Sequence, residues 1–549
     1  SIGNFDSFNP FIIKGAPATG TNLMFETLMG SPADDSLSEY GLIAKSVEVP
    51  RDLSYVIYNL RKNAKFHDGS PITAEDVIFS YTSLKKRGRP FYRYYYANVT
   101  KAEKLNSHRV KFSFSGPPNR ELPQILGQLP VLSKAWWTKN DFSKTTLNPP
   151  TGSGPYKIKA FEPGRFIIYE RVKDYWGQNI PLRVGKHNFD FIRYDYYRDQ
   201  AVALEAFKAG LYDFRFEGSS KDWATGYNFP ARDRGDVKTA LLKHSRPVGM
   251  QAFAFNIRRP QFKAKSVRQA LSYAFDFEWS NRQLFYGQYS RTESYFQNSD
   301  LAASKLPTAK ELKILTPLRG KVPDEVFSKV YQSPKTDGTG RNRSNLRKAA
   351  RLLRQAGWKI IDNRLVSKYG KPLIIEFLLF EGSFQRIINP YILNLKRIGI
   401  DARIRIVDVA NFQHRMQQFD FDVVVQRYVQ NNTPGIEQKT YYGSAMADTP
   451  GSRNLAGIKN PAVDYLVDRV IGSNSRKELI TAVHALDRVL MWNKYMVPQW
   501  YKGVHNLAYW NKFERPKVKP KFDLGMLDTW WYSPRKAAMI KFGKAPNKP

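Results

Sequence analysis

Short apolar runs of strand length alternate with helical patterns through the second half of the chain. The runs are LIIEFLLF (373–380), ARIRIVDV (402–409) and FDVVVQRYV (421–429), and one intervening helical pattern spans 386–397. Strands that alternate with helices in this way favour an α/β architecture. At 549 residues the chain is long enough for at least two hydrophobic cores. We therefore expect an α/β protein with more than one folded unit.

The segment NLRKNAKFHDGSPITAEDVIFSY (59–81) holds the first His of the chain and an acidic pair, and it tests whether the chain is an enzyme. Asp68-Gly69 is typical of a tight turn. Thr73 fits the N-cap of a helix, with Asp76 three residues later, and carboxylates in a first turn are favoured by the helix dipole. No second His or third carboxylate lies at ligand spacing. The pattern predicts a turn and a capped helix rather than a catalytic or metal site.

Enzyme signatures are absent from the sequence. It contains no His-Glu-x-x-His, no Gly-x-Ser-x-Gly and no Gly-x-Gly-x-x-Gly after a strand. It contains no Cys, which excludes disulfides, thiolate metal sites and a Cys nucleophile. Asp276 and Glu278 form the best glycosidase-like pair, but a spacing of two on a predicted helix points them to different faces. We expect no catalysis, cofactor or metal; a carbohydrate hydrolase using this pair is the alternative.

The chain is strongly basic, with 86 Lys and Arg against 49 Asp and Glu and a net charge of +37. These residues are scattered, and neither zinc-finger spacing nor a basic region with heptads occurs. Scattered charge favours a diffuse field that attracts anionic ligands or surfaces, although a basic source proteome explains it equally well. A basic surface-binding protein for nucleic acid or lipopolysaccharide is a second alternative. Aromatic residues, at 14%, fit either a lined binding cleft or large cores.

The N-terminus gives an expectation about location. The sequence opens on Ser1 rather than Met, which is typical of a chain whose signal peptide has been removed. No apolar run reaches the roughly 18–20 residues that span a bilayer. The lack of Cys is compatible with the periplasm and equally with the cytosol.

Several stretches, taken in order, resemble the extracytoplasmic solute-binding proteins that serve ABC importers of peptides. They are LRKNAKFHDGSPITAEDVIFSY, TGSGPYKI, YERVKDYWG, VRQALSYAFDFEWSN and NLRKAARLLRQAGW. Five further segments are similar in sequence to the Yej-type subgroup. They are FDSFNPFIIKG, NRELPQILGQLPVL, GMQAFAFNIRRPQF, FDFEWSNRQLFYGQYSRTESYFQNS and TPGIEQ. The resemblance runs over nearly the whole chain and implies a Gram-negative periplasmic protein.

The resemblance implies the type II fold of periplasmic binding proteins, which is α/β with two lobes joined by hinge strands and is enlarged here by an extra sub-lobe (cluster C). Lobe I would comprise 1–247 and 505–549, with the sub-lobe at about 45–155, and lobe II would comprise 257–497. The hinge strands would lie at about 248–256 and 497–504.

The resemblance also suggests ligand-binding positions. The loop GAPATGTN (15–22) corresponds to one that meets the peptide backbone. Relatives often place an Asp against the ligand ammonium in the loop after 421–429, where this chain departs from the pattern and Glu437 could substitute. The implied ligand-binding residues are Ala18, Thr19, Gly20, Trp279, Arg386, Arg427, Tyr428, Gln430, Asn431, Asn432 and Glu437.

The resulting hypothesis is a periplasmic binding protein that encloses oligopeptides between two lobes and delivers them to an inner-membrane ABC permease with cytoplasmic ATPase subunits. Its basic charge suggests an anionic cargo, and the subgroup makes murein peptides or microcin C-like peptide conjugates plausible. We expect a monomer that does not bind nucleic acid.

Overall fold

The protein is described by a computed structural model that covers residues 1–35, 37–116 and 119–540. These residues divide into two compact units. Unit 1 comprises Ser1–Glu217, Gly226–His244 and the chain from Asn506 onward; unit 2 comprises Gly218–Thr225 and Ser245–His505. Most of unit 2 is therefore one continuous insertion into unit 1. The lobe, sub-lobe and hinge boundaries expected from the sequence stay predictions.

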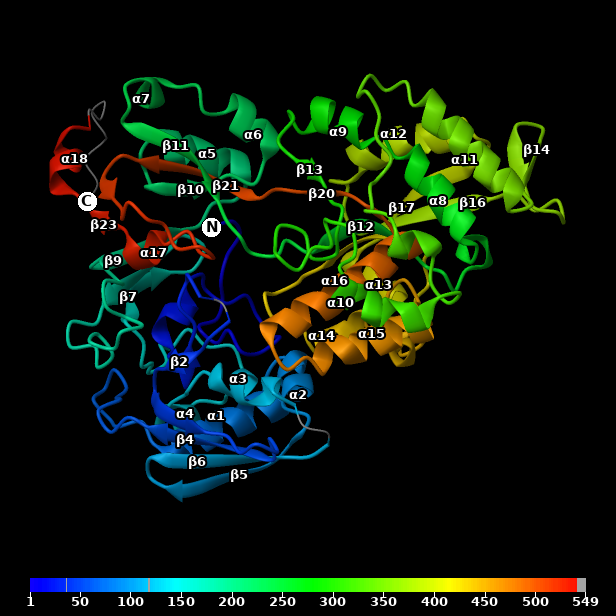
Figure 1. Cartoon of the computed structure of the whole chain (residues 1–549). Coiled ribbons are helices and arrows are strands. Elements are labelled where there is room, and N and C mark those ends of the chain that lie inside the picture. The colour runs from blue at the N-terminus through cyan, green and yellow to red at the C-terminus, as the bar shows by residue number, and fades with distance from the viewer. Residues whose placement is uncertain (36, 117–118, 541–549) are drawn as a thin grey trace. The chain divides into compact units, whose positions relative to one another are not determined.

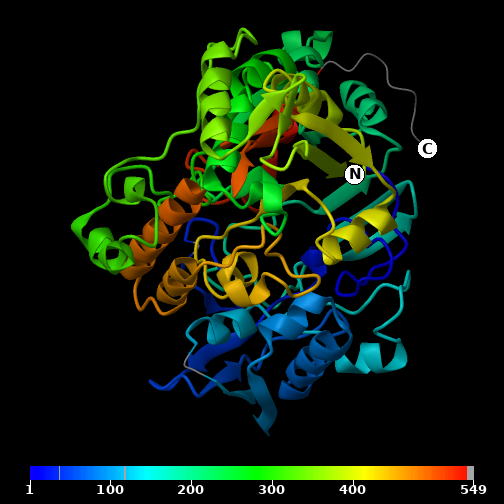
Figure 2. The same cartoon turned by 90° about the vertical axis from the view of Figure 1, so that its right-hand side faces the viewer.

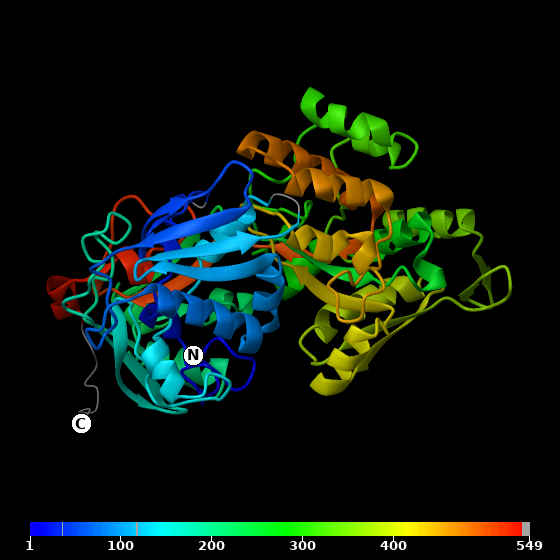
Figure 3. The same cartoon turned by 90° about the horizontal axis from the view of Figure 1, so that it is seen from below.

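Unit 1 contains an antiparallel four-stranded sheet of order β3-β4-β6-β5. Figure 3 shows helix α1 (Ala74–Arg87) along one face of this sheet. The alternating patterns SYVIYNL (54–60) and RVKFSFSG (109–116) predict two half-buried strands. The structure confirms both, as β4 and β6, and pairs them with each other. The strands are β3 (Ala44–Glu48), β4 (Tyr55–Leu60), β5 (Val99–Asn106) and β6 (Arg109–Phe114).

The predicted turn and capped helix after β4 are confirmed. Thr73 is the N-cap of α1, and both its amide nitrogen and its hydroxyl donate to Asp76 Oδ2, at 2.9 and 2.8 Å. Glu75 lies on the surface, where hydrogen bonds from Lys104 and Lys134 lower its pKa to about 2. His67 Nε2 is 2.8 Å from the carbonyl oxygen of Gly154. All of these groups have structural partners, as a helix start requires.

Unit 1 also contains two three-stranded sheets. One is antiparallel, of order β7-β8-β9, and the other has the order β10-β21-β11. Strand β21 comes from the end of the chain and lies between β10 and β11. The strands are β7 (Tyr156–Glu162), β8 (Phe166–Arg171), β9 (Phe191–Asp195), β10 (Phe214–Phe216), β11 (Val237–Lys243) and β21 (Val504–Trp510). Helices elsewhere in unit 1 include α2 (Pro90–Tyr95), α3 (Glu121–Gly127), α4 (Lys134–Lys139), α5 (Gln200–Lys208), α7 (Pro230–Asp233), α17 (Met526–Thr529) and α18 (Pro534–Ala538).

Unit 2 is built on a mixed five-stranded sheet of order β17-β16-β18-β12-β19. Strand β16 is parallel to β17 and to β18, whereas β12 is antiparallel to β18 and β19. The three apolar runs identified in the sequence form β16, β17 and β18, so the α/β prediction is confirmed. The strands are β12 (Met250–Phe255), β16 (Ile374–Leu379), β17 (Asp401–Ile406), β18 (Val423–Tyr428) and β19 (Met496–Pro498).

Helices cover both faces of this sheet, and the alternation of β12 shows how. Phe253 and Phe255 pack with helices α8, α11 and α12 on one side, whereas Ala252 and Ala254 pack with α15 and α16 on the other. Figure 2 shows α15 and α16 (orange) side by side. The helices of unit 2 include α6 (Ser220–Thr225), α8 (Lys265–Ala274), α9 (Phe277–Leu284), α10 (Ala309–Leu315), α11 (Arg343–Gln355), α12 (Gln385–Lys396), α13 (Val409–Gln417), α14 (Glu437–Tyr442), α15 (Pro461–Ile471) and α16 (Arg476–Asn493).

A buried ionic cluster joins α10 to α16. Glu311 Oε2 accepts a hydrogen bond from Arg488 Nε at 2.8 Å, and Glu311 Oε1 lies 3.3 Å from His484 Nδ1. Burial opposes ionisation of Glu311, but the hydrogen bonds from His484 and Arg488 lower its pKa to about 2 from the ordinary 4.5. The ionised carboxylate is therefore more favourable in the folded chain than in the unfolded one.

This cluster predicts an acid-sensitive contribution to stability. Because the folded pKa of Glu311 is depressed, its contribution is complete above about pH 5 and is lost as the pH falls towards 2. Glu311→Gln should lower stability at pH 7, because the buried Arg488 loses its ionised partner, and should flatten the profile between pH 5 and 2. Urea unfolding across that range checks this. Glu205→Gln, which changes an exposed carboxylate, is the control and should keep the loss of stability between pH 5 and 2. The same loss of stability in Glu311→Gln would contradict the prediction.

Candidate ligand-binding site

The loop expected to meet ligand in unit 1 is held by tyrosines from the neighbouring sheet. Tyr169 OH donates to the carbonyl oxygen of Thr19 at 2.8 Å. Tyr196 OH accepts from the Thr19 amide nitrogen at 2.7 Å and lies 3.1 Å from Thr19 Oγ1. Of the three predicted residues here, Ala18 is buried and Thr19 is exposed. The loop is therefore fixed through the backbone of Thr19, which leaves one side of that residue facing solvent.

Gly20 permits this arrangement for two reasons. Its φ of +89° lies in the left-handed region that disfavours a side chain. A Cβ there would stand 2.6 Å from a ring carbon of Tyr194 and 2.8 Å from one of Tyr169. The loop approaches the tyrosines as closely as it does because position 20 has no side chain.

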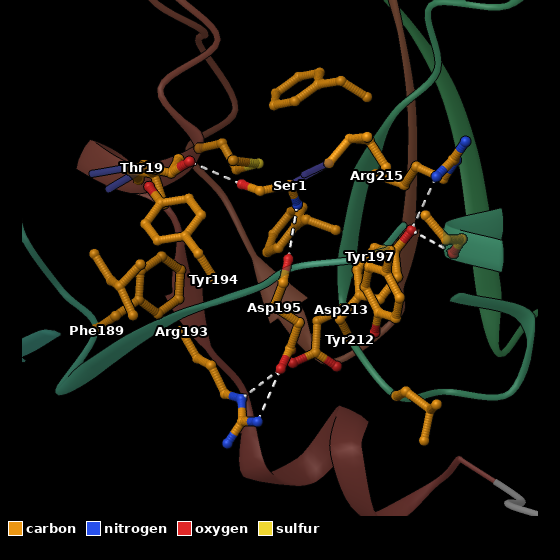
Figure 4. A pocket seen from close by; sticks show the side chains of 18 of the residues that line it. Ser1, Thr19, Phe189, Arg193, Tyr194, Asp195, Tyr197, Tyr212, Asp213 and Arg215 are labelled. Carbon is orange, nitrogen blue, oxygen red and sulfur yellow. Dashed lines mark hydrogen bonds and ion pairs between the residues drawn. The ribbon is translucent and has the colours of Figure 1, made fainter. Parts of the chain in front are cut away.

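Thr19 borders a cavity of about 650 Å³ within unit 1. Figure 4 shows its walls, with Phe189 and Tyr194 on one side and Tyr197 and Tyr212 on the other. Strands β9 and β10 and the chain after β21 supply most of the lining. The lining includes Thr19, Phe189, Phe191, Arg193, Tyr194, Asp195, Tyr197, Gln200, Leu211, Tyr212, Asp213, Phe214, Arg215, Phe216, Phe513 and Met526.

The charged side chains of this cavity are paired within the protein. Arg193 Nε donates to Asp195 Oδ1 at 2.8 Å, and Lys512 Nζ to Asp213 Oδ1 at 2.7 Å. Arg215 Nε donates to Glu217 Oε2 at 2.9 Å. Because these charged groups are paired with one another, a ligand in the cavity would mainly contact aromatic faces and neutral polar groups. Such a wall suits an apolar or aromatic side chain with a hydrated polar end.

Burial keeps the tyrosine hydroxyls of the cavity protonated. It raises the pKa of Tyr194 and of Tyr197 to about 12, and it also raises the pKa of Tyr212. These groups can donate and accept hydrogen bonds at neutral pH, but they are poor general bases there. They therefore act in this cavity as neutral hydrogen-bonding groups.

Apart from Thr19, the residues that line this cavity were not predicted from the sequence. Its signal is the run FDFIRYDYYR (189–198), in which five of nine consecutive residues from Phe189 to Tyr197 are aromatic. Strand alternation places alternate side chains of such a run on one face. A search for aromatic-rich strand ends would have found it.

In unit 2, the predicted residues around the end of β18 have different surroundings. Tyr428 is 1% exposed and packs on the rings of Tyr441 and Tyr442 at centroid distances of 5.5 and 5.6 Å. Gln438 Nε2 donates to Gln430 Oε1 at 2.7 Å. The structure therefore brings Tyr428 and Gln430 into one buried network with α14, which supports the loop from within.

The remaining residues of that loop are partly engaged. The Glu437 carboxylate accepts from the Gly435 amide at 3.1 Å and from Gln438 Nε2, and burial raises the pKa of Glu437. Asn431 is exposed, and its Oδ1 accepts from the Thr433 amide at 2.8 Å. The carbonyl oxygen of Asn432 accepts from Arg476. This loop is built by hydrogen bonds between its own residues and to α16.

The other predicted residues of unit 2 lie on separate elements. Arg427 is exposed on β18, and its Nη2 is 3.5 Å from the carbonyl oxygen of Val248. Arg386 is exposed in the first turn of α12, with its guanidinium 5.8 Å from the ring centre of Phe285. Trp279 lies in the first turn of α9 and lines a second cavity of about 220 Å³ with Asp276 and Tyr391.

Asp276 and Glu278 do not point to different faces, as the sequence suggested. Asp276 is the N-cap of α9 rather than a residue within the helix, and its Oδ1 accepts from the Trp279 amide at 3.0 Å. Thr336 Oγ1 lies 2.5 Å from Asp276 Oδ1 and 3.3 Å from Glu278 Oε2, so both carboxylates meet the same hydroxyl. They have structural roles in capping α9 and holding the 333–340 segment.

No group of three or more His, Asp or Glu side chains at metal-binding distance occurs within residues 1–35, 37–116 and 119–540. Among the same residues, no helix combines the length and apolar composition needed to cross a bilayer.

Residues 40–446 match the family model of bacterial extracellular solute-binding proteins, family 5. The chain is a family 5 solute-binding protein. Members of this family are binding proteins, not enzymes, and work with ABC transporter permeases. The family 5 protein described here is 46% identical over 539 residues to the probable peptide-binding protein YejA of Agrobacterium fabrum, with 96% of this chain and 88% of that protein covered.

Other relatives of this family 5 protein include YejA of Escherichia coli, 39% identical over 542 residues, with 98% and 89% of the two chains covered. The peptidoglycan-binding protein YepA of Agrobacterium fabrum is 37% identical over 547 residues, with 96% and 89% covered. These similarities confirm the resemblance to the Yej-type subgroup.

Solved structures establish the fold. A periplasmic oligopeptide-binding protein of Thermotoga maritima aligns with a TM-score of 0.72 at 19% identity, covering 96% of this chain and 94% of that one. The oligopeptide-binding protein AppA of Bacillus subtilis, solved with a nonapeptide, aligns with a TM-score of 0.70 at 21% identity, covering 97% of each chain. The predicted fold class, the two-lobe α/β fold of periplasmic binding proteins, is confirmed.

Proposed function

We propose that this protein captures oligopeptides in the periplasm, as a monomer, and delivers them to an inner-membrane ABC permease with cytoplasmic ATPase subunits. The observation that carries the proposal is its 46% identity, over 96% of the chain, to a probable peptide-binding protein. We further propose that it performs no catalysis and does not bind nucleic acid. As the sequence resemblance implies, residues 1–247 with 505–549 would form lobe I and 257–497 lobe II, and hinge movement would enclose the ligand.

The chemistry of the proposed sites supports a peptide ligand. Peptide side chains of varied type need apolar, hydrated walls, and the tyrosine-lined cavity beside Thr19 offers them. Thr19, Arg386, Arg427 and Asn431 are exposed and would contact ligand directly. The shape of the two ligand-binding loops would depend on Ala18, Gly20, Tyr428 and Gln430. The other proposed ligand-binding residues are Trp279, Asn432 and Glu437.

The net charge of +37 favours acidic cargo, which includes peptides of the murein type or peptide conjugates with a phosphate group. Calorimetry with three peptides of equal length, one acidic, one neutral and one basic, tests this. We expect the acidic peptide to bind about tenfold more tightly than the basic one at low salt. Tighter binding of the basic peptide would contradict the anionic preference, and binding of none of them would contradict the proposed function.

Arg386 provides a local test of the same preference. Because its guanidinium is exposed and lies 5.8 Å from the ring centre of Phe285, Arg386→Gln should leave stability nearly unchanged. The substitution should lower the affinity for the acidic peptide several-fold and leave the affinity for the neutral peptide unchanged. Arg351→Gln, an equal charge change on an exposed face of α11, is the control and should bind both peptides normally. Equal effects of the two variants would contradict a ligand contact by Arg386.

A further inference from the structure

Helix α11 presents a stripe of positive charge. Its buried face consists of Asn345, Leu346, Ala349 and Leu353. The exposed face carries Arg343, Arg347, Arg351 and Arg354, at spacings of four, four and three, with Lys348 beside them. The helix contains no acidic residue. Side chains three or four positions apart are neighbours on a helix, so the arginines form one continuous row.

These five side chains form no ion pair with the part of the chain that the structure describes. Like charges at such spacings repel one another and weaken a helix slightly. An anionic partner would turn this repulsion into attraction. The row of arginines on α11 is therefore suited to binding an anionic partner outside the chain.

A hairpin follows α11 directly and adds apolar side chains. The helix ends at Gln355, Gly357 takes a φ of +85°, and strands β14 (Lys359–Ile361) and β15 (Arg364–Val366) pair in antiparallel register. Positive φ values of 47° at Asp362 and 60° at Asn363 make a two-residue turn that matches the twist of the strands. Figures 1 and 3 show this hairpin projecting from the body of unit 2 close to the C-terminal end of α11.

The hairpin and the turn after it expose large apolar groups. Ile360 is 55% exposed, Ile361 54% and Tyr369 77%. The same hairpin and turn carry four exposed basic residues, against one exposed carboxylate at Asp362, and within the described chain these four form no ion pair; they are Lys359, Arg364, Lys368 and Lys371. Ile360 and Ile361 are consecutive strand residues and point to opposite faces of the hairpin, so a bilayer would have to admit its tip edge-on. Exposed isoleucines and a tyrosine are costly in water but suit the boundary between lipid headgroups and acyl chains.

We propose that the row on α11 and this hairpin form a docking surface for a bilayer containing anionic phospholipid. Basic side chains near such a bilayer are attracted to its negative surface potential, and the isoleucines and tyrosine would bury in the interface while the lysines and arginines reach the phosphates. Apolar insertion combined with surrounding cations distinguishes a lipid surface from a soluble acidic partner. This inference goes beyond peptide capture and does not depend on it.

Vesicle sedimentation of the full chain tests the proposal. Phosphatidylcholine vesicles with about a quarter phosphatidylglycerol should bind the protein at low salt, and phosphatidylcholine alone should not. Replacing three arginines (Arg347→Gln, Arg351→Gln and Arg354→Gln) should lower partitioning about 10- to 100-fold. The control carries the same charge change at exposed positions outside the proposed surface (Lys62→Gln, Lys86→Gln and Lys173→Gln), and its partitioning should fall less than about threefold, because those side chains belong to neither α11 nor the hairpin.

A second measurement reports the hairpin itself. The chain has no Cys, so Ile361→Cys provides a single site for an environment-sensitive fluorophore. Its emission should shift to the blue with anionic vesicles, whereas a label at Lys62→Cys should not shift. Absence of binding to anionic vesicles, equal losses in the two triple variants, or a shift with soluble polyglutamate and none with vesicles would each overturn the proposal.

Discussion

Replacing Asp487 by Ala should lower the free energy of unfolding by about 3–5 kcal/mol. Asp487 is 1% exposed in the middle of α16. Its carboxylate accepts from Ser294 Oγ at 2.7 Å and from the amide nitrogens of Tyr295 and Ala303 at 2.8 and 3.0 Å. Alanine would leave these buried donors without a partner, and each unsatisfied group costs about 1–3 kcal/mol. Urea unfolding measures the loss, and hydrogen exchange of residues 294–303 locates it.

Asp468→Ala is the matched control for this variant. Asp468 lies on the adjacent helix α15, and its pair with Lys439, at 2.9 Å, is solvent exposed. Such a pair contributes about 0–1 kcal/mol. Similar losses in the two variants, or normal exchange protection at Tyr295 in Asp487→Ala, would show that the carboxylate does not hold this loop.

Replacing Gly20 by Ala should cost about 2–4 kcal/mol and also weaken peptide binding. One part of the cost is the left-handed backbone, with φ at +89°. The other part is overlap, since the new Cβ would stand 2.6 Å from Tyr194 and 2.8 Å from Tyr169. Relief requires movement of tyrosines that hold Thr19 and line the cavity, so calorimetry should show reduced affinity together with reduced stability in urea.

Gly185→Ala separates the two contributions. Gly185 has a φ of +75°, but an added Cβ would meet nothing within 4 Å. We expect a loss of about 1–2 kcal/mol, from the backbone alone, and unchanged peptide binding. If Gly20→Ala were no more harmful than this control, close packing of the loop against the tyrosines would be refuted.

Local signals in the sequence were sufficient for much of the fold. Short patterns of polarity, turns and caps predict the capped start of α1 at Thr73, strands β4 and β6, and strands β16, β17 and β18 of the unit 2 sheet. The pairing of β4 with β6 was not predicted. The pattern RSNLRKAARLLRQAGW (343–358) predicts a helix capped by Ser344 or Asn345, and this cap is wrong, because α11 begins at Arg343 with Asn342 as its N-cap. Several polar residues in succession fit a cap equally well, so the pattern alone leaves the boundary uncertain by one or two positions.

The candidate site was less predictable, because it depends on contacts between residues far apart in sequence. Thr19 is held by Tyr169 and Tyr196, about 150 and 177 positions away. The position of Tyr428 on a strand does not show that its ring packs against α14 rather than facing solvent. Likewise, the spacing of Asp276 and Glu278 suggested divergence, whereas Thr336 brings both carboxylates to one hydroxyl. Such arrangements arise from tertiary packing, which periodicity does not encode.

Strand β21 constrains the order in which the protein can be completed. It lies between β10 and β11, yet residues 244–503, which include most of unit 2, separate it from β11 in the sequence. While the chain emerges from a ribosome or a membrane channel, unit 2 has all of its strands before this sheet of unit 1 has its middle one. The edges of β10 and β11 therefore stay open until about residue 510 arrives. A nascent chain halted before that point should remain susceptible to protease at Phe214–Phe216, even when unit 2 already resists digestion.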